Sequence, residues 1–397
     1  MPGVPVAVVM LFWNALLVSI CATTTATADR TPHCKTVEDC HRAGFCNTTT
    51  GECKCAKGFG GDTCEGLQME SFACGDGGLC LANGSTTWGG SVVQADDGSF
   101  HMYAAMMVDN LTLTDWLTAS VVLHAVSQTG AAGPYIASDI ALAPRPEPFF
   151  DSVMIHNPDA KRTRDGKYVI FYDGSSKPPS GQAQQDAQLP TGLNPIILRQ
   201  RIGIATASSP YGPWTRRDLP ILQPSNETGT WDQFFVTNPA PYVFPNGSVL
   251  LTYKSGRTST FPGMYEGIAV ADSIDGPYRR LTPGNAPLDL PANCEDPGIY
   301  FDNQYKIFRM VLHCGCSSQL LWSDDGIGWQ THGPQQTQGW CDNITYANGT
   351  IGSVVTRQRP KWVVDAKTGS ATHLTTGVNR LGDSGMGHTW TMAAALL

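Results

Sequence analysis

Charged side chains are scarce in this 397-residue chain, and their scarcity limits the fold. Asp, Glu, Lys and Arg make up 15% of the residues, whereas about 25% is usual in soluble domains. Helices on a protein surface need a charged or polar face, so few such helices are expected. The 42 Gly and 27 Pro residues indicate many turns instead. The composition therefore favours an all-β fold.

Basic residues and metal-binding patterns are also lacking. The 26 Lys and Arg residues are outnumbered by 34 Asp and Glu residues, which gives a net charge of −8. Nucleic-acid binding depends on basic side chains that neutralise phosphates, so no nucleic-acid partner is expected. The nine His residues show no HExxH or comparable spacing. We therefore expect no catalytic metal and no cofactor.

The N-terminus carries a long apolar run at residues 4–22, followed by the small residues Ala26-Thr27-Ala28. This pattern predicts a signal peptide at residues 1–28 and a secreted or extracellular protein. Because no Lys or Arg precedes the run, an uncleaved membrane anchor is the alternative. An oxidising compartment also fits the 13 Cys residues. Seven N-x-[ST] sequons are predicted glycosylation sites: Asn47, Asn83, Asn110, Asn226, Asn246, Asn343 and Asn348.

Six cysteines gather in a segment too short to bury a stable core without disulfides. They are Cys34, Cys40, Cys46, Cys53, Cys55 and Cys64. Spacing alone leaves their pairing open, but the pattern, with Gly61 before the last cysteine, resembles the EGF-like domain. The resemblance implies bridges of Cys34 with Cys46, Cys40 with Cys53, and Cys55 with Cys64. It also implies an EGF-like module over residues 29–66, a spacer or adhesive unit for a cell-surface or matrix partner.

The remaining cysteines are predicted to form disulfides as well. Cys74 is expected to pair with Cys80. Cys314 and Cys316 are too close for a bridge between them, so each should pair elsewhere. Cys294 and Cys341 are the candidates, and the pairing among these four residues stays open.

The rest of the chain repeats one unit five times. Each copy begins with a tight turn and an apolar run rich in β-branched and aromatic residues, which predicts a β-hairpin. The turns start at residues 97, 165, 246, 302 and 368. Four strands in each of five units predict a five-bladed β-propeller over residues 67–397, closed by strand pairing near residues 387–392. An ordinary β-sandwich is the competing architecture.

The repeats resemble five-bladed propellers related to glycoside hydrolase family 43, as HNPDAKRTRDGKYVIFYDG, TNPAPYVFPNGSVLLTYKSG and CEDPGIYFDNQYKIF illustrate. The resemblance implies a site at the channel mouth, where the first strand of each blade begins. It also implies three catalytic carboxylates: an Asp on each of the first two blades and a Glu on the third. The aligned repeats place other residues around the channel: Gly90, Asn157, Asn238, Asp296 and Arg359. The expected carboxylate pattern is therefore broken.

Glycoside hydrolysis usually needs two carboxyl groups, one of them protonated. Glu295 is the candidate acid, with Asp296 or Asp232 as its partner. Because neighbouring side chains on a strand point to opposite faces, Glu295 and Asp296 converge only where the strand is bulged or irregular. Asp232 also has a counterpart in the second blade, Asp151, which favours a structural role for both. Glu266 is expected to be solvated on a loop.

Polar residues around the channel suit sugar hydroxyl groups. The predicted substrate-binding residues are His156, Asn157, Asn238, His313, Arg359 and Trp88. The sequence thus predicts a secreted glycoside hydrolase that acts on a carbohydrate or glycan. The alternative is a catalytically inactive carbohydrate-binding or adhesion protein on the same propeller.

Overall fold

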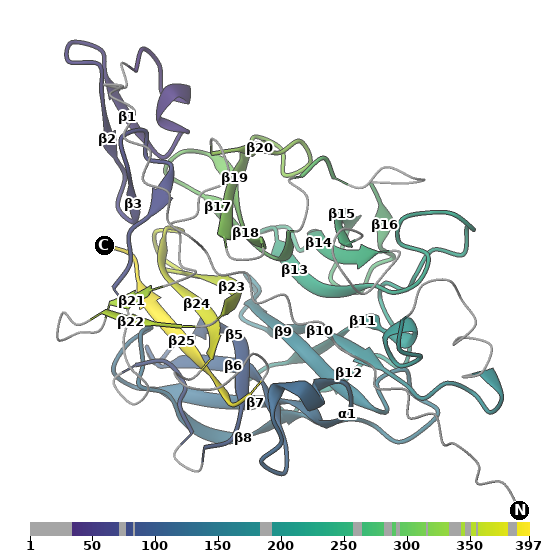
Figure 1. Cartoon of the computed structure of the whole chain (residues 1–397). Coiled ribbons are helices and arrows are strands. Elements are labelled where there is room, and N and C mark those ends of the chain that lie inside the picture. Colours follow the sequence, from purple (N-terminus) through teal and green to yellow (C-terminus); the bar gives the residue numbers. More distant parts are fainter. Residues whose placement is uncertain are drawn as a thin grey trace, which may run out of the picture.

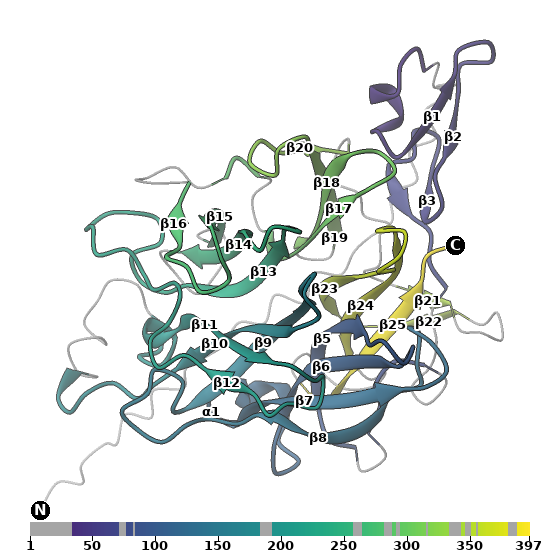
Figure 2. The same ribbon diagram turned by 180° about the vertical axis from the view of Figure 1, so that it is seen from behind.

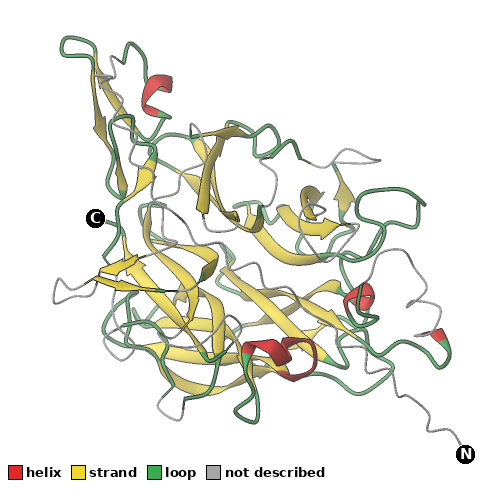
Figure 3. Cartoon of the chain, viewed as in Figure 1, coloured by secondary structure: helices red, strands yellow, loops and turns green. Residues whose placement is uncertain are grey.

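The computed structural model describes residues 34–70, 77–81, 84–182, 193–256, 264–281, 288–290, 294–314, 317–332, 343–345, 351–354, 356–379 and 387–397. Within these ranges the regular secondary structure is almost entirely β-strand, joined by turns and loops (Figure 3). In these ranges no helix has the length and apolarity needed to cross a membrane. The predicted signal peptide at residues 1–28 lies outside the described residues.

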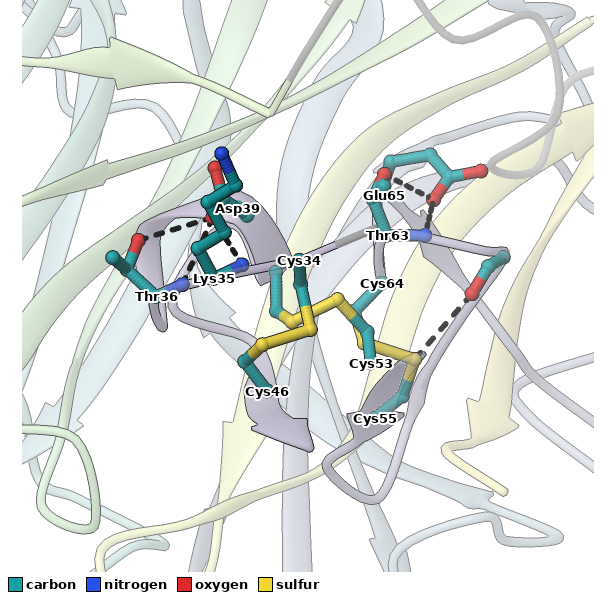
Figure 4. Close-up of a disulfide and its surroundings, with 12 residues drawn as sticks. Cys34, Lys35, Thr36, Asp39, Cys46, Cys53, Cys55, Thr63, Cys64 and Glu65 are labelled. Atoms are coloured by element: carbon teal, nitrogen blue, oxygen red, sulfur yellow. Dashed lines mark hydrogen bonds between the residues drawn. A yellow bond between two sulfur atoms is a disulfide. The ribbon is translucent and has the colours of Figure 1, made fainter. Parts of the chain in front are cut away.

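The N-terminal segment is held together by disulfides and shares an apolar cluster with blades 4 and 5. It contains the 3₁₀ helix η1 (Glu38–Cys40) and the strands β1 (Gly44–Asn47), β2 (Glu52–Cys55), β3 (Phe59–Gly60) and β4 (Gly66–Leu67). Three bridges link Cys34 to Cys46, Cys40 to Cys53, and Cys55 to Cys64 (Figure 4). This pairing confirms the one that the resemblance implied.

Two later cysteine predictions are also tested. Cys294 bonds Cys314, which settles one of the open pairings and ties the start of one inner strand to the next strand. Cys80 is disulfide-bonded as expected. Its predicted partner Cys74 lies outside the described residues, as do Cys316 and Cys341.

Five antiparallel sheets form the propeller, one blade after another along the chain (Figures 1 and 2). Blade 1 holds β5 (Thr87–Gln94), β6 (Phe100–Met107), β7 (Ser120–Ser127) and β8 (Ile136–Leu142); η2 (Leu113–Asp115) and α1 (Trp116–Ala119) lie between β6 and β7. Blade 2 holds β9 (Met154–Arg162), β10 (Tyr168–Ser175), β11 (Arg201–Ala207) and β12 (Thr215–Arg216), with η3 (Ile197–Arg199) before β11. Blade 3 holds β13 (Thr237–Val243), β14 (Val249–Gly256), β15 (Met264–Ala271) and β16 (Arg279–Arg280).

The last two blades complete the ring. Blade 4 holds β17 (Glu295–Asp302), β18 (Ile307–Cys314), β19 (Ser317–Ser323) and β20 (Gln330–Thr331). Blade 5 holds β23 (Arg357–Val364), β24 (Ala371–Asn379) and β25 (Thr389–Ala395), and the short pair β21 (Asn343–Thr345) and β22 (Ile351–Ser353) precedes it. Leu79 and Met69 pair with Thr391 and Leu396, so the start of the propeller closes onto its last strand as predicted.

The inner strand of every blade carries the same bulge. In each blade the pairing register with the second strand shifts at one dipeptide. The first residue of each dipeptide has a positive φ: Gly89, Asn157, Asn238, Asp296 and Arg359. The member on blade 1 is therefore Gly89, which corrects the predicted Gly90. Bulges redirect side chains, and this one lets the adjacent residues Glu295 and Asp296 serve one site.

Candidate functional site

Four polar side chains and one glycine, the five bulge residues, line a cavity at the channel mouth. Asn157 Nδ2 donates to Asn238 Oδ1 at 2.6 Å, and Asn238 Nδ2 donates in turn to Asp296 Oδ1. Arg359 Nη1 lies 2.8 Å from that same carboxylate oxygen. Asp296 Oδ2 is buried and accepts no hydrogen bond from any described residue. This oxygen is therefore available to a ligand or a proton.

Blade 1 contributes no carboxylate to this ring. A Cβ atom on Gly89 would lie 2.6 Å from the Arg359 Cβ, so the arginine occupies the space that a larger residue would need. A Cβ on Gly377 would lie 2.6 Å from the Trp88 ring. Trp88 thus packs against the second strand of blade 5, and only 3% of it is exposed. The mouth is therefore polar on blades 2 to 5 and apolar next to Trp88.

Glu295 lies at the start of β17 beside two groups that favour its charged form. Lys254 Nζ donates to Glu295 Oε2, and His313 Nδ1 lies 3.7 Å from Oε1. Burial alone would raise the pKa of Glu295, but the Lys254 ammonium and His313 hold that pKa well below its usual value. Glu295 is thus an ionised carboxylate, which does not suit the proton-donating role predicted for it.

Glu266 has the opposite environment. It lies on β15 directly across from Lys254 on β14, so the two side chains share one face of blade 3. Only 2% of Glu266 is exposed, so the prediction of a solvated residue is wrong. Neither carboxyl oxygen has a hydrogen-bond partner among the residues that the structure describes. Burial raises the pKa of Glu266 well above its usual value, with the negative charges of Asp296 and Glu295 adding to the shift and Lys254 opposing it.

His156 and Asp173 form a cross-strand pair on blade 2. The His156 ring contacts Ser120 Oγ at 2.6 Å through Nδ1 and packs against Trp116, with ring centroids 5.2 Å apart. Burial and the nearby Arg359 lower the pKa of His156 far below its usual value, so the imidazole is neutral. Burial raises the pKa of Asp173 to about 6 although Arg359 opposes the shift.

Lys361 also lines the cavity, next to the bulge residues. Lys361 Nζ donates to the backbone carbonyls of Pro239 at 2.9 Å and Pro297 at 2.8 Å, and it pairs with Asp159 at 3.0 Å. The two prolines follow bulge residues of blades 3 and 4, so Lys361 ties the bulges of neighbouring blades together. Lys361 therefore adds a cationic group to the polar lining of the cavity.

Asp232, the other predicted catalytic carboxylate, has partners of a different kind. Tyr253 Oη donates to Asp232 Oδ2 at 2.9 Å, and Arg280 Nε donates to the same oxygen at 2.5 Å. Asp151 on the preceding blade accepts in the same way from Tyr172 at 2.9 Å and from Arg216. Each aspartate clamps an outer strand of its blade, as the repeat equivalence favoured, and Asp232 is not among the residues that line the mouth cavity.

Three donor atoms of the mouth could also ligate a cation. The side chains of Glu295, Asp296 and His313 bring them within 4.8 Å of one another. Lys254 and Arg359 already neutralise the two carboxylates, so the geometry favours ion pairs over a metal ion. The expected absence of a catalytic metal stays a prediction.

The structure brings together all six predicted substrate-binding residues around or beside the ring, together with Glu295 and Asp296. The sequence did not identify Glu266 as a protonated carboxyl group of the site, nor Lys254 as the cation that keeps Glu295 ionised. One signal was present, because the family resemblance implied a glutamate on the third blade and Glu266 lies there. Its burial depends on the pairing of β14 with β15, which the residue pattern did not specify.

Comparison with solved structures supports the architecture. A family 117 glycoside hydrolase from the marine bacterium Zobellia galactanivorans matches with a TM-score of 0.59 at 17% identity, over 83% of this chain and 89% of that one. An α-L-arabinofuranosidase from Lactobacillus brevis matches with a TM-score of 0.51 at 12% identity, over 78% and 90% of the two chains. No protein-family model and no curated protein sequence matches the chain. At these identities the likeness shows a five-bladed propeller fold, and function must be argued from the site.

Proposed function

We propose that this chain is a secreted glycoside hydrolase in which Glu266 is the general acid and Asp296 the general base. One observation carries the proposal: the buried, unpartnered carboxyl group of Glu266 lies near enough to Asp296 and Glu295 for their charges to raise its pKa. Environments that separate the pKa values of neighbouring carboxyl groups are how glycosidases obtain an acid and a base at one pH. Glu266 supplies the protonated group, and Asp296 Oδ2 supplies the free acceptor.

The proposed reaction assigns one proton movement to each residue. Glu266 donates its proton to the glycosidic oxygen as the bond from that oxygen to the anomeric carbon breaks. Asp296 Oδ2 removes a proton from the water that attacks the anomeric carbon. The Lys254 ammonium, already next to Glu295, stabilises the carboxylate that forms on Glu266. Asn157, Asn238, Arg359 and neutral His156 hold sugar hydroxyl groups, and the Trp88 side of the pocket offers an apolar sugar face a surface.

A second candidate function rests on a different observation. The ring lacks a carboxylate on blade 1, where Arg359 covers Gly89, and blade 2 offers Asn157, which cannot carry a proton as a carboxylate does. A site with these features suits binding of a glycan without hydrolysis. In that case the same polar groups recognise the sugar, and Glu266 only donates a hydrogen bond.

The N-terminal segment belongs to the proposal as an EGF-like module docked on blade 4. Arg42 pairs with Asp324, and Arg309 Nη2 donates to the Arg42 carbonyl at 2.7 Å. The Arg309 guanidinium also lies 4.7 Å from the Phe59 ring centroid. These contacts make the module a fixed part of the surface beside blade 4 (Figure 1). A cell-surface or matrix partner for it stays a prediction.

Hydrolysis of a panel of aryl glycosides and plant and algal oligosaccharides by the full-length secreted chain tests the proposal. Turnover that Glu266→Gln and Asp296→Asn each abolish supports it, and the anomer formed first, read by NMR, gives the stereochemistry. Asp151→Asn is the matched control, because it alters a buried aspartate outside the mouth. If calorimetry shows that an oligosaccharide binds but is not hydrolysed, the second candidate function, glycan binding, holds instead of hydrolysis. Turnover that survives Glu266→Gln would place the acid elsewhere.

A further inference from the structure

A hydrogen-bonded chain of side chains crosses blade 1 at the end of the β5–β6 hairpin that is opposite Gly89. Ser99 Oγ contacts Asp97 Oδ1 and also His101 Nε2, the latter at 2.8 Å. His101 Nδ1 lies 2.8 Å from His124 Nε2, and His124 Nδ1 lies 2.7 Å from Asp139 Oδ1. The chain therefore joins the hairpin turn to β6, β7 and β8 in four consecutive contacts. Ser99 and both imidazoles are buried, whereas the Asp139 side chain is 43% exposed.

The hydrogens available do not suffice for these contacts. Each contact needs one hydrogen, and both terminal groups are acceptors when Asp97 and Asp139 are ionised. The Ser99 hydroxyl supplies one hydrogen, and the neutral imidazoles of His101 and His124 supply one each. Four contacts thus share three hydrogens. One contact would then oppose two acceptors at less than 3 Å, which is repulsive.

We propose that this chain binds one extra proton, shared between His101 and His124, and thereby clasps the outer strand β8 to blade 1 in a pH-dependent manner. With one imidazolium, all four contacts have a donor and an acceptor. A second proton has no place, because both nitrogens of the His101–His124 contact would then be donors. Burial, and after it the neighbouring His124, lowers the pKa of His101 to about 4, while Asp97 and Asp139 oppose the shift.

The surroundings supply the charge that balances the extra proton. Asp97 and Asp139 face the imidazoles from the two ends, and hydrogen bonds from Ser99 keep the pKa of Asp97 below its usual value. The other groups packed on the imidazoles are phenols: the Tyr103 ring stacks on His124 at 5.0 Å, and Tyr211 meets both imidazoles edge-on at 5.1 and 5.2 Å. Burial raises the pKa of Tyr103 above its usual value, so it stays neutral.

Apart from its pairing with β7, the strand β8 is held by few buried side chains. Its first five residues are exposed, including Ile136 at 75%, and its pairing with β7 has two register shifts. When the extra proton leaves, the contact that is easiest to break is His124–Asp139, because Asp139 can turn toward water. Because β8 is the edge strand of blade 1 (Figure 1), loss of the proton loosens that edge.

The direction of the pH dependence follows from proton counting. Above neutral pH the folded chain binds a proton that free histidines, with a pKa near about 6.5, have lost. The stability from this network is thus lost as the pH rises through the titration of the network. At acidic pH the unfolded chain binds two protons and the folded network only one, so stability also falls there. The contribution is largest near about pH 6.

The variant Asp139→Asn gives a decisive test, because its amide N–H supplies the missing fourth hydrogen without a proton. We would compare the thermal midpoints of the full-length wild type and this variant between about pH 6 and about pH 8.5. The curves should cross: the variant is at or below the wild type at the lower pH and above it at the higher pH. Asp139→Ala should fall about 3 °C below the wild type at the lower pH and approach it at the higher pH.

Asp96→Asn is the matched control, since Asp96 is an exposed aspartate in the same hairpin turn that pairs with Arg162 instead. Its midpoint should run parallel to that of the wild type. Hydrogen exchange of the β8 amides, corrected for the intrinsic pH effect, should increase with pH in the wild type and not in Asp139→Asn. Parallel midpoint curves for Asp139→Asn and the wild type would overturn the proposal, as would β8 exchange that does not depend on pH.

Discussion

Buried carboxylates occur in two regions: the clamps, in which Asp151 and Asp232 hold the outer strands, and the channel mouth. The two regions differ in the hydrogen bonds that these carboxylates accept. In the clamps, Asp151 and Asp232 each accept from a tyrosine of the second strand and an arginine of the fourth. At the mouth, Asp296 keeps one oxygen without a described partner, and Glu266 keeps both. Leaving a buried polar atom unpaired costs about 1–3 kcal/mol. The clamps therefore stabilise the blades, whereas the mouth retains an unfavourable arrangement that a ligand or a proton transfer can relieve.

The two regions also show that one repeat can serve two purposes. The clamp recurs on blades 2 and 3, where it holds an outer strand of only two residues, β12 or β16. The bulge recurs on all five blades, yet it carries four different residue types: glycine on blade 1, asparagine on blades 2 and 3, aspartate on blade 4 and arginine on blade 5. Repetition of the backbone with divergence of the side chain is what a propeller needs to build an asymmetric site on a symmetric frame.

Glu266→Gln should produce the largest effect. Removing a general acid typically costs a factor of about 10²–10⁴ in rate, and the proposed hydrolysis should fall accordingly. Stability should not fall, because a neutral amide replaces a carboxyl group that is itself neutral in the folded chain. The rate of hydrolysis and the thermal midpoint, measured on the same samples, check both parts. A variant that is destabilised but keeps its turnover number would make Glu266 a structural residue.

Asp232→Ala should have the opposite effect: it should lower stability and leave the turnover number unchanged. It leaves the partly exposed Arg280 guanidinium and the buried Tyr253 hydroxyl without their acceptor, and an unsatisfied buried group costs about 1–3 kcal/mol. The turnover number of the folded fraction should stay unchanged. Chemical denaturation gives the loss of stability, and Asp151→Ala should behave in the same way. If Asp232→Ala removed turnover without destabilising the chain, Asp232 would belong to the mouth after all.

The fold could be read from the sequence because its signals are local and repeated. Each hairpin turn precedes an apolar run, and five copies leave few architectures open. The geometry of the site was harder to predict, because it depends on the register in which neighbouring strands pair. The bulge on blade 1 falls at Gly89 rather than Gly90, and two adjacent glycines without a proline give no local signal to choose between them. Likewise, the partners of Glu266 follow from strand pairing, so a residue that resembled a solvated loop position is buried.

Asp173→Asn tests the cost of burying a charge at the mouth. The pKa of Asp173 is raised to about 6 in the folded chain, above the usual value of about 3.9. A raised pKa means that the folded state binds the proton more tightly, so Asp173 favours folding at low pH and opposes it as the pH rises through about 6. The amide variant should therefore gain about 2 kcal/mol of stability near pH 8 and about nothing near pH 4. Denaturation curves for Asp173→Asn and for the exposed control Asp62→Asn measure the difference, and an equal gain at both pH values would refute the raised pKa.

Lys254→Met should have the smallest effect and the most specific one. The Lys254 ammonium opposes the rise in the pKa of Glu266 and is the main group that lowers the pKa of Glu295. Without it both pKa values rise, so the high-pH limb of the hydrolysis rate, which reports deprotonation of Glu266, should shift upward by about one pH unit. Lys254→Arg keeps the charge and should keep the limb in place. A limb that does not move in Lys254→Met would mean that Glu266 is not the titrating acid, even if the rate itself had changed.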